Sequence, residues 1–256
     1  MNAKATPDRN TVAFITGGNT GIGAGLARAL HARGARVIIG GRDRARLEAV
    51  ARDCPGMEVE LIDVADVRSI ADCVARIAAR HPDLNLLVNN AGIQKLVDFA
   101  ADGPLTAADL EAEIDTNLKG LIHVTNAFLP LLKRQPAARL VQVSSALAFV
   151  PMVIAPIYSA TKSAVHAFTV ALREQLEGSP VKVIELIPPA VKTDLHRGQQ
   201  RQPISQMPLE EFVAHAMRGL DQGHDEIAVG LAKVARLMAR LAPGRIFRIV
   251  NRKAKR

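Results

Sequence analysis

The chain has 256 residues, of which 48% are hydrophobic, and its 33 lysine and arginine residues outnumber 25 acidic ones. This length and apolar content suffice for one compact α/β domain and exclude an intrinsically disordered protein. With no tryptophan, one tyrosine and seven phenylalanines, the chain has too few aromatic rings to bind nucleic acid by base stacking, so we expect no nucleic-acid partner.

The net charge of +8 comes from the C-terminal end of the chain. Residues 227–256 hold nine basic residues and no acidic one, which leaves 24 basic against 25 acidic residues in 1–226. We therefore expect a nearly neutral domain over residues 1–230 and a basic helical extension over residues 231–256.

Short apolar runs alternate with longer segments of helical periodicity along the chain. The expected strands cover residues 12–16, 36–40, 59–63, 84–90, 139–145, 181–187 and 226–230. The expected helices cover 21–33, 43–53, 66–80, a segment beginning near Thr106, and about 157–178. Continuously apolar strands that alternate with helices predict an α/β fold in which a doubly wound parallel sheet forms a Rossmann-type single domain.

A glycine-rich loop follows the first strand. It reads TGGNTGIG over residues 16–23 and leads directly into the first helix. Glycines let the backbone approach a pyrophosphate, and the free N–H groups of the helix N-terminus bind anions. The alternative is a plain tight turn, but the position of the loop in the first βαβ unit favours a dinucleotide site.

The end of the second strand bears on which dinucleotide is bound. The position where an acidic residue would bind the ribose 2′-hydroxyl of NAD is Gly41, and Arg42 follows it. A small residue beside a guanidinium suits a 2′-phosphate, so we expect NADP(H) to be preferred, with NAD(H) as the alternative cofactor. Otherwise Arg42 is a solvated surface residue.

The single tyrosine, Tyr158, lies at a spacing from a lysine and a serine that favours proton exchange. Tyr158 and Lys162 are four residues apart, so on a helix they share one face. A cation near a phenol lowers its pKa from ~10 by roughly 1–3 units, which favours proton exchange near neutral pH. Ser145 ends the fifth strand 13 residues earlier, where open α/β sheets bind ligands. Ser144 is its rival, and either serine taken alone is an ordinary strand-end residue.

The motifs taken together resemble those of the classical short-chain dehydrogenase/reductase family over roughly residues 10–230. They occur in the family's order, and the PPAVKTDL segment at 188–195 is similar to its DltE-like bacterial branch. The motifs that carry this resemblance are TGGNTGIG at 16–23, Asp63-Val64, Asn89-Asn90-Ala91-Gly92, Asn117, Ser145, and Tyr158 with Lys162.

The resemblance implies a hydride transfer between a nicotinamide cofactor and a carbonyl or secondary alcohol. Tyr158 would exchange the proton, Lys162 would hold the nicotinamide ribose and lower the phenol pKa, Ser145 would orient the carbonyl, and Asn117 would position a water molecule. On its own, Asn117 is equally well explained as a satisfied polar residue inside a helix.

The resemblance also implies a cofactor-binding set. Asp63 would face the adenine, Asn90 the adenosine and Thr193 the carboxamide. The full expected set is Thr16, Gly17, Asn19, Thr20, Gly21, Ile22, Gly23, Arg42, Asp63, Val64, Asn90, Ala91, Gly92, Tyr158, Lys162, Pro188, Val191 and Thr193. Pro189 stands where the family usually has glycine, and proline removes a backbone donor at that point. The polar segment after Thr193 lies where the family keeps a substrate lid.

Two other functions remain open from the sequence. One is a catalytically silent nucleotide-binding regulatory protein, against which the intact set of Ser145, Tyr158 and Lys162 argues. The other is a non-redox reaction on the same scaffold, such as epimerisation, dehydration or ester hydrolysis.

The surface and the location of the protein can also be anticipated. The apolar girth of the helix around 159–177 predicts burial on two sides and a homo-oligomer, a dimer or a tetramer. In the extension, Lys233, Arg236 and Arg240 share one helical stripe and Arg245, Arg248 and Arg252 another. The extension either covers the substrate pocket with a solvated basic face or lies on an anionic membrane.

We expect a cytoplasmic protein without a bound metal. The N-terminal segment has no apolar stretch of the kind found in signal peptides, and the two cysteines and seven histidines show no metal-ligand spacing.

Overall fold

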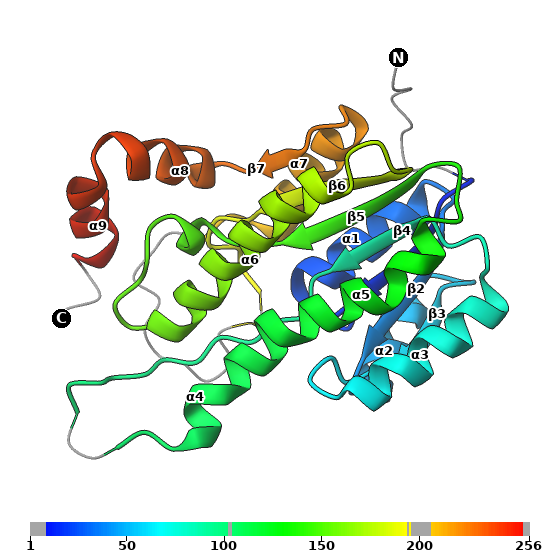
Figure 1. Cartoon of the computed structure of the whole chain (residues 1–256), viewed down its shortest axis with the longest axis horizontal. Helices are drawn as coiled ribbons and strands as arrows, with labels where there is room; N and C mark the ends of the chain where they lie inside the picture. Colours follow the sequence, from blue (N-terminus) through cyan, green and yellow to red (C-terminus); the bar gives the residue numbers. More distant parts are fainter. Residues whose placement is uncertain (1–8, 102–103, 194, 196–205, 253–256) are drawn as a thin grey trace.

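The computed structural model describes residues 9–101, 104–193, 195 and 206–252. Its helices lie on both faces of a central sheet (Figure 1). The strands are β1 (Val12–Thr16), β2 (Arg36–Gly41), β3 (Glu58–Leu61), β4 (Leu86–Asn89), β5 (Ala138–Val143), β6 (Val181–Ile187) and β7 (Glu226–Ala228). They pair in the order β3-β2-β1-β4-β5-β6-β7, and every pair is parallel. The predicted doubly wound parallel sheet is thus confirmed, with strand ends shifted by up to a few residues.

Helices α1 to α7 lie between successive strands along the chain, and α8 and α9 follow the last strand. They are α1 (Gly21–Ala32), α2 (Arg44–Arg52), α3 (Val67–Arg80), α4 (Ala107–Ile114), α5 (Leu121–Leu132), α6 (Pro156–Gln175), α7 (Leu209–Asp221), α8 (Leu231–Leu241) and α9 (Pro243–Asn251). A π-helical turn, η1 (Asp115–Gly120), joins α4 to α5, and a short 3₁₀ turn, η2 (Ala146–Ala148), follows β5. Helix α7 was not among the expected helices, although Phe212, Ala216 and Leu220 recur there at helical spacing, and no pattern indicated the change from α- to π-helix.

Two apolar cores sandwich the sheet, because successive strand residues point to opposite faces. Ala13 and Ile15 of β1 belong to the core beneath α1, α2 and α7. Val12 and Phe14 belong to the core beneath α3, α5 and the end of α6. The ring of Phe14 stacks on that of Phe128 with centroids 5.1 Å apart. Burial on both faces explains why the strands read as unbroken apolar runs.

The extension forms α8 and α9, which lie at one end of the molecule (Figure 1). The buried side chain of Asn251 fixes α9 to the segment that follows η2. Its Oδ1 accepts from the backbone N–H of Val153 at 2.8 Å, and its Nδ2 donates to the carbonyl of Pro151 at 3.0 Å. Helices α8 and α9 thus lie in the segment predicted to be a helical extension, and α9 contacts the segment at 151–153.

Candidate active site

The predicted site residues come together at the carboxyl ends of the parallel strands. Thr16 ends β1 and Gly41 ends β2, Asn90 follows β4, Ser145 follows β5, and Pro188 follows β6. This is the edge at which open α/β sheets bind ligands. Residues far apart in the sequence therefore form one continuous site.

The glycine loop is locked to the turn after β4. Asn90 Nδ2 donates to the carbonyls of Thr16 and Gly17 at 3.0 and 3.1 Å. Thr16 Oγ1 accepts from the backbone N–H groups of Asn90 and Ala91 at 3.0 and 3.1 Å. Gly17 has φ +64°, and a Cβ on Gly23 would lie 2.3 Å from the Gly17 carbonyl oxygen. Only glycine fits these positions, and the resulting cradle at the N-terminus of α1 suits a pyrophosphate.

The residues expected around the adenosine end also meet. The Asn19 amide lies over Gly41, whose Cβ would be 3.6 Å from Asn19 Oδ1. Arg42 Nη1 lies 3.8 Å from Asp63 Oδ2, and both side chains are largely exposed. Asp63 Oδ1 also accepts from the backbone N–H of Ala65 at 3.0 Å. The exposed ion pair between Arg42 and Asp63 contributes little free energy, so Arg42 can exchange Asp63 for a phosphate group.

The segment after β6 closes the opposite side of the loop. Thr193 lies against the start of α1, because a Cβ on Gly21 would be 3.1 Å from the Thr193 Cβ. The Pro188 carbonyl accepts from the Ala146 backbone N–H at 2.9 Å, and Val191 is buried. Most of the expected substrate lid lies outside the described residues.

Ser145 and Tyr158 lie near one another. Hydrogen bonding from Ser145 favours the ionised phenol and lowers the pKa of Tyr158, against the effect of burial. Ser145 Oγ accepts from the backbone N–H of Leu147 at 3.1 Å. Ser144 instead donates to Glu185 Oε1 at 2.6 Å. The structure therefore distinguishes the two serines, since Ser144 is engaged by Glu185 whereas Ser145 acts on the phenol.

Lys162 lies beneath the tyrosine and is almost completely buried. Its Nζ donates to the Val143 carbonyl at 2.9 Å and lies 5.6 Å from the centre of the Tyr158 ring. Burial lowers the pKa of the ammonium to about 8. The turn after β4 lies close to this ammonium group, since a Cβ added to Gly92 would be 3.7 Å from Lys162 Nζ.

Asn117 lies in the π-helical turn and is fully buried. Its amide clamps the backbone of Ile93, accepting from the N–H at 2.8 Å and donating to the carbonyl at 2.9 Å. It also donates to Thr161 Oγ1 at 3.3 Å. The side chain is thus satisfied by protein groups, as the simpler interpretation of this residue expected, and its proposed role with water stays a prediction. π-Helical turns are frequently found at functional sites.

Sequence reasoning missed Glu113, one turn before Asn117. The side chain is fully buried, Oε1 accepts from the Lys95 backbone N–H at 2.9 Å, and Oε2 has no hydrogen-bond partner among the described residues. Burial raises the pKa of this carboxyl, against the opposing hydrogen bond from Lys95. On an amphipathic helix a single glutamate is normally a solvated residue, so no sequence signal identified it.

The environment of Tyr158 keeps its phenol protonated. Burial raises the pKa of Tyr158 well above its ordinary value, the hydrogen bond with Ser145 opposes this rise, and the negative charge of Glu113 adds to it. The expectation that Lys162 lowers the phenol pKa stays a prediction, because burial dominates in this structure. At neutral pH the phenol therefore carries its proton.

The lone tyrosine makes this pKa directly measurable. Ultraviolet titration of the cofactor-free protein should give a tyrosinate midpoint above the ordinary value of ~10, because the neutral phenol is the form that burial favours. Glu113→Gln should lower that midpoint, since it removes a negative charge at constant side-chain size. Glu111→Gln, on the exposed side of the same helix, should leave it unchanged; equal shifts in both variants would contradict a specific contact.

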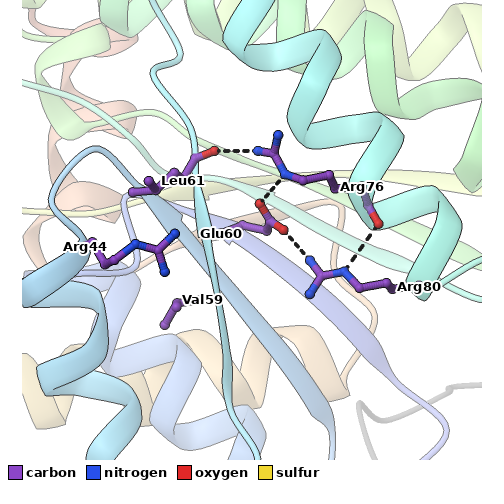
Figure 2. Close-up of a pocket in the computed structure, with 6 residues that line it drawn as sticks. All are labelled: Arg44, Val59, Glu60, Leu61, Arg76 and Arg80. Carbon is purple, nitrogen blue, oxygen red and sulfur yellow. Dashed lines mark hydrogen bonds and ion pairs between the residues drawn. The ribbon is translucent and has the colours of Figure 1, made fainter.

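Away from these residues, a hollow lies at the sheet edge, between α2, β3 and α3 (Figure 2). Its volume is about 490 Å³, and it is lined by Arg44, Val59, Glu60, Leu61, Arg76 and Arg80. Arg76 Nε lies 3.0 Å from one oxygen of Glu60, and Arg80 bonds the other. Glu60 thus pairs with two of the three guanidinium groups, and the hollow contains none of the predicted site residues.

Comparison with known proteins agrees with this geometry. Residues 11–203 match the family model described as short chain dehydrogenase. The chain belongs to the short-chain dehydrogenase family. It is 39% identical over 246 residues to the Bacillus subtilis (strain 168) protein named uncharacterized oxidoreductase DltE, covering 94% of this chain and 97% of that protein. This places it in the DltE-like branch of the short-chain dehydrogenases and confirms the resemblance in its motifs.

Solved structures of short-chain dehydrogenases superpose over most of the chain. A short chain dehydrogenase from Burkholderia cenocepacia J2315 in complex with NADP is 29% identical with a TM-score of 0.82, covering 96% of this chain and 99% of that one. An alcohol dehydrogenase from the archaeon Thermococcus sibiricus, complexed with 5-hydroxy-NADP, is 27% identical with a TM-score of 0.74, covering 82% and 90%.

Membrane spans and metal clusters are both absent among residues 9–101, 104–193, 195 and 206–252. No helix there is both long and apolar enough to cross a membrane. No three histidine, cysteine or acidic side chains within those ranges come together as a metal ion would require.

Proposed function

We propose that this short-chain dehydrogenase is an NADP(H)-preferring oxidoreductase that interconverts a carbonyl compound and a secondary alcohol. The observation that carries the proposal is the grouping of Ser145, Tyr158 and the buried Lys162, whose Nζ lies 5.6 Å from the centre of the Tyr158 ring, beside the glycine cradle at the strand ends. Relatives complexed with NADP, 5-hydroxy-NADP and NADH support a nicotinamide dinucleotide as the cofactor.

The residues fit a dinucleotide along the strand ends. Gly17, Gly21 and Gly23 form the cradle for the pyrophosphate, and Asn90 fixes its shape. A nicotinamide bound beyond the cradle supplies or accepts the hydride. Tyr158 donates the proton to the substrate oxygen in the reductive direction and accepts it in the oxidative one. In the reductive direction the carbonyl gains one hydride and one proton and becomes a hydroxyl group.

The other residues hold the reacting groups. Ser145 orients the substrate oxygen toward the phenol, since its hydroxyl lies near enough to influence the pKa of Tyr158. Lys162 holds the nicotinamide ribose, and its charge opposes the burial penalty on a phenolate. Asn117 positions the segment after β4 by clamping Ile93. The remaining expected cofactor contacts, such as Thr193 beside Gly21, belong to the same proposal.

The cofactor preference follows from Arg42. The ratio of kcat/KM for NADPH over NADH should exceed one in the wild type, because charge-assisted hydrogen bonds to the 2′-phosphate form only with NADPH. Arg42→Ala should reduce that ratio by roughly 10- to 150-fold, the effect of about 1.5–3 kcal/mol for a hydrogen bond to a charged group. Arg52→Ala, at the exposed end of the next helix, serves as the control. An NADH preference above tenfold in the wild type would contradict the proposal.

A homo-oligomer formed by α6 is part of the same proposal. The outward side of α6 exposes small or apolar residues, Ala160, Ala167, Val170 and Ala171. An apolar groove of about 390 Å³ continues this surface toward Ile114 and Phe99. A second copy of the chain would cover it, because apolar patches of this kind are costly in water. Light scattering should give at least twice the chain mass of 27.4 kDa; a monomer would contradict it.

A further inference from the structure

The C-terminal helices α8 and α9 turn an apolar face outward. On α8 the small side chain of Ala232 is buried, while four larger ones at helical spacing are exposed: Leu231 (60%), Val234 (50%), Leu237 (57%) and Leu241 (71%). On α9, Ile249 is 67% exposed. Helices normally bury their large apolar residues and expose the small or polar ones, so this pattern is inverted. The simpler expectation, a merely solvated basic face, does not describe this surface.

Cations flank the apolar face. Lys233, Arg240, Arg245, Arg248 and Arg252 are exposed on the same two helices. Residues 227–256 contain no acidic residue, and no ion pair to these five cations occurs among the described residues. Arg236 differs from the sequence expectation, because it pairs with Glu226 and is withdrawn from the basic stripe. The surface thus combines exposed leucines with a net positive charge that nothing on these helices neutralises.

The charge decides between the occupants that such a face could have. A second copy of the chain would meet it through a two-fold contact, which places the same patch against itself. Five cations would then face five cations across an apolar centre, at a cost in electrostatic repulsion. An anionic bilayer instead accepts the leucines at the acyl boundary and attracts the cations at the headgroups.

We propose that α8 and α9 form a docking surface for an anionic lipid bilayer. The helices lie in the plane of the interface, with Leu231, Val234, Leu237 and Leu241 toward the acyl chains. They do not cross the membrane, and their attachment is reversible and weakened by salt. The extension at 231–256 is thereby a functional segment distinct from the domain at 1–230.

The surface formed by α8 and α9 lies beside the segment between Ser145 and Tyr158. Asn251 ties α9 to the backbone of Pro151 and Val153, in the segment between Ser145 and Tyr158. When these helices lie on a bilayer, apolar carbonyl compounds dissolved in the membrane would be close to the segment at 151–153. This consequence rests on the proposed function, whereas the docking itself does not.

Sedimentation with lipid vesicles tests the docking independently of activity. The full chain should pellet with vesicles of phosphatidylglycerol and phosphatidylcholine, and much less with phosphatidylcholine alone. The double variant Leu237→Glu/Leu241→Glu should lose at least about tenfold in partition coefficient, because it removes apolar insertion and adds charge repulsion. Each of Lys233→Ala and Arg240→Ala should cost about fivefold.

The control replaces an apolar residue of matched exposure far from the extension. Val67, at the start of α3, is 55% exposed, and Val67→Glu should leave vesicle binding unchanged. Circular dichroism and turnover of a water-soluble carbonyl should be unchanged in the leucine variant, which separates loss of docking from loss of fold or of the proposed function. Equal binding to neutral vesicles, retention of binding in the leucine variant, or a lowered oligomer mass with unchanged vesicle binding would each overturn the proposal.

Discussion

Replacing Tyr158 with phenylalanine should lower kcat for carbonyl reduction by roughly 10²–10⁴-fold, the contribution of a positioned proton donor. The ring stays in place, and only the hydroxyl that bonds Ser145 is lost. Because Tyr158 is the only tyrosine, no neighbouring phenol can replace it. Turnover of NADPH with a panel of aldehydes and ketones measures the effect.

Binding and fold should survive this substitution. Phenylalanine fills almost the same buried volume, so NADPH affinity, followed by its fluorescence, should change little. Turnover equal to the wild type would refute the role of Tyr158. A wild type that binds NADPH but reduces nothing in the panel would instead favour a catalytically silent or non-redox protein, which separates failure of the mechanism from failure of the functional class.

A side chain at Gly23 should disrupt the dinucleotide cradle. In Gly23→Ala the Cβ would lie 2.3 Å from the Gly17 carbonyl oxygen and 2.5 Å from Asn90 Nδ2, distances that force the backbone of the loop to move. Overpacking of this kind costs about 1–3 kcal/mol. We therefore expect NADPH affinity to fall by roughly 5- to 150-fold if the loop must be restored on binding.

Thermal unfolding provides a second measurement on the same variant. A loss of about 1–3 kcal/mol corresponds to a fall in Tm of roughly 2–12 °C for a domain of this size. Gly244→Ala is the matched control, since its Cβ would meet nothing within 4 Å. If Gly23→Ala bound NADPH and melted like the wild type, the loop would not be held as tightly as the structure indicates.

The sequence determined the fold class and predicted most residues of the candidate site. The strands are buried on both faces, so their unbroken apolar runs carried a clear signal, and all seven were found in place. Tyr158 and Lys162 were related by local helical geometry, which spacing alone defines. The glycine loop could be predicted because its turn needs residues without a Cβ, and glycine is the one residue type that lacks a Cβ.

Other features depended on contacts between distant residues. The π-helical turn at Asp115–Gly120 and the pairing of Arg236 with Glu226 have no periodicity or spacing that predicts them. Helix α7 differs, because Phe212, Ala216 and Leu220 recur at helical spacing and were overlooked in the sequence. Ser144 and Ser145 are chemically equivalent in sequence, and only the approach of α6 to the end of β5 assigned the phenol to Ser145.

The basic extension shows the same division. Composition alone located the excess charge of +8 in the last 30 residues and predicted two short helices there. It could not decide which side of each helix faces the protein. The side that faces the protein depended on two contacts. Asn251 anchors α9 to the segment at 151–153, and Ala232 packs inward, which leaves the leucines of α8 exposed. Local pattern thus fixed which residues share a face, whereas the burial of that face was decided by its neighbours in the tertiary structure.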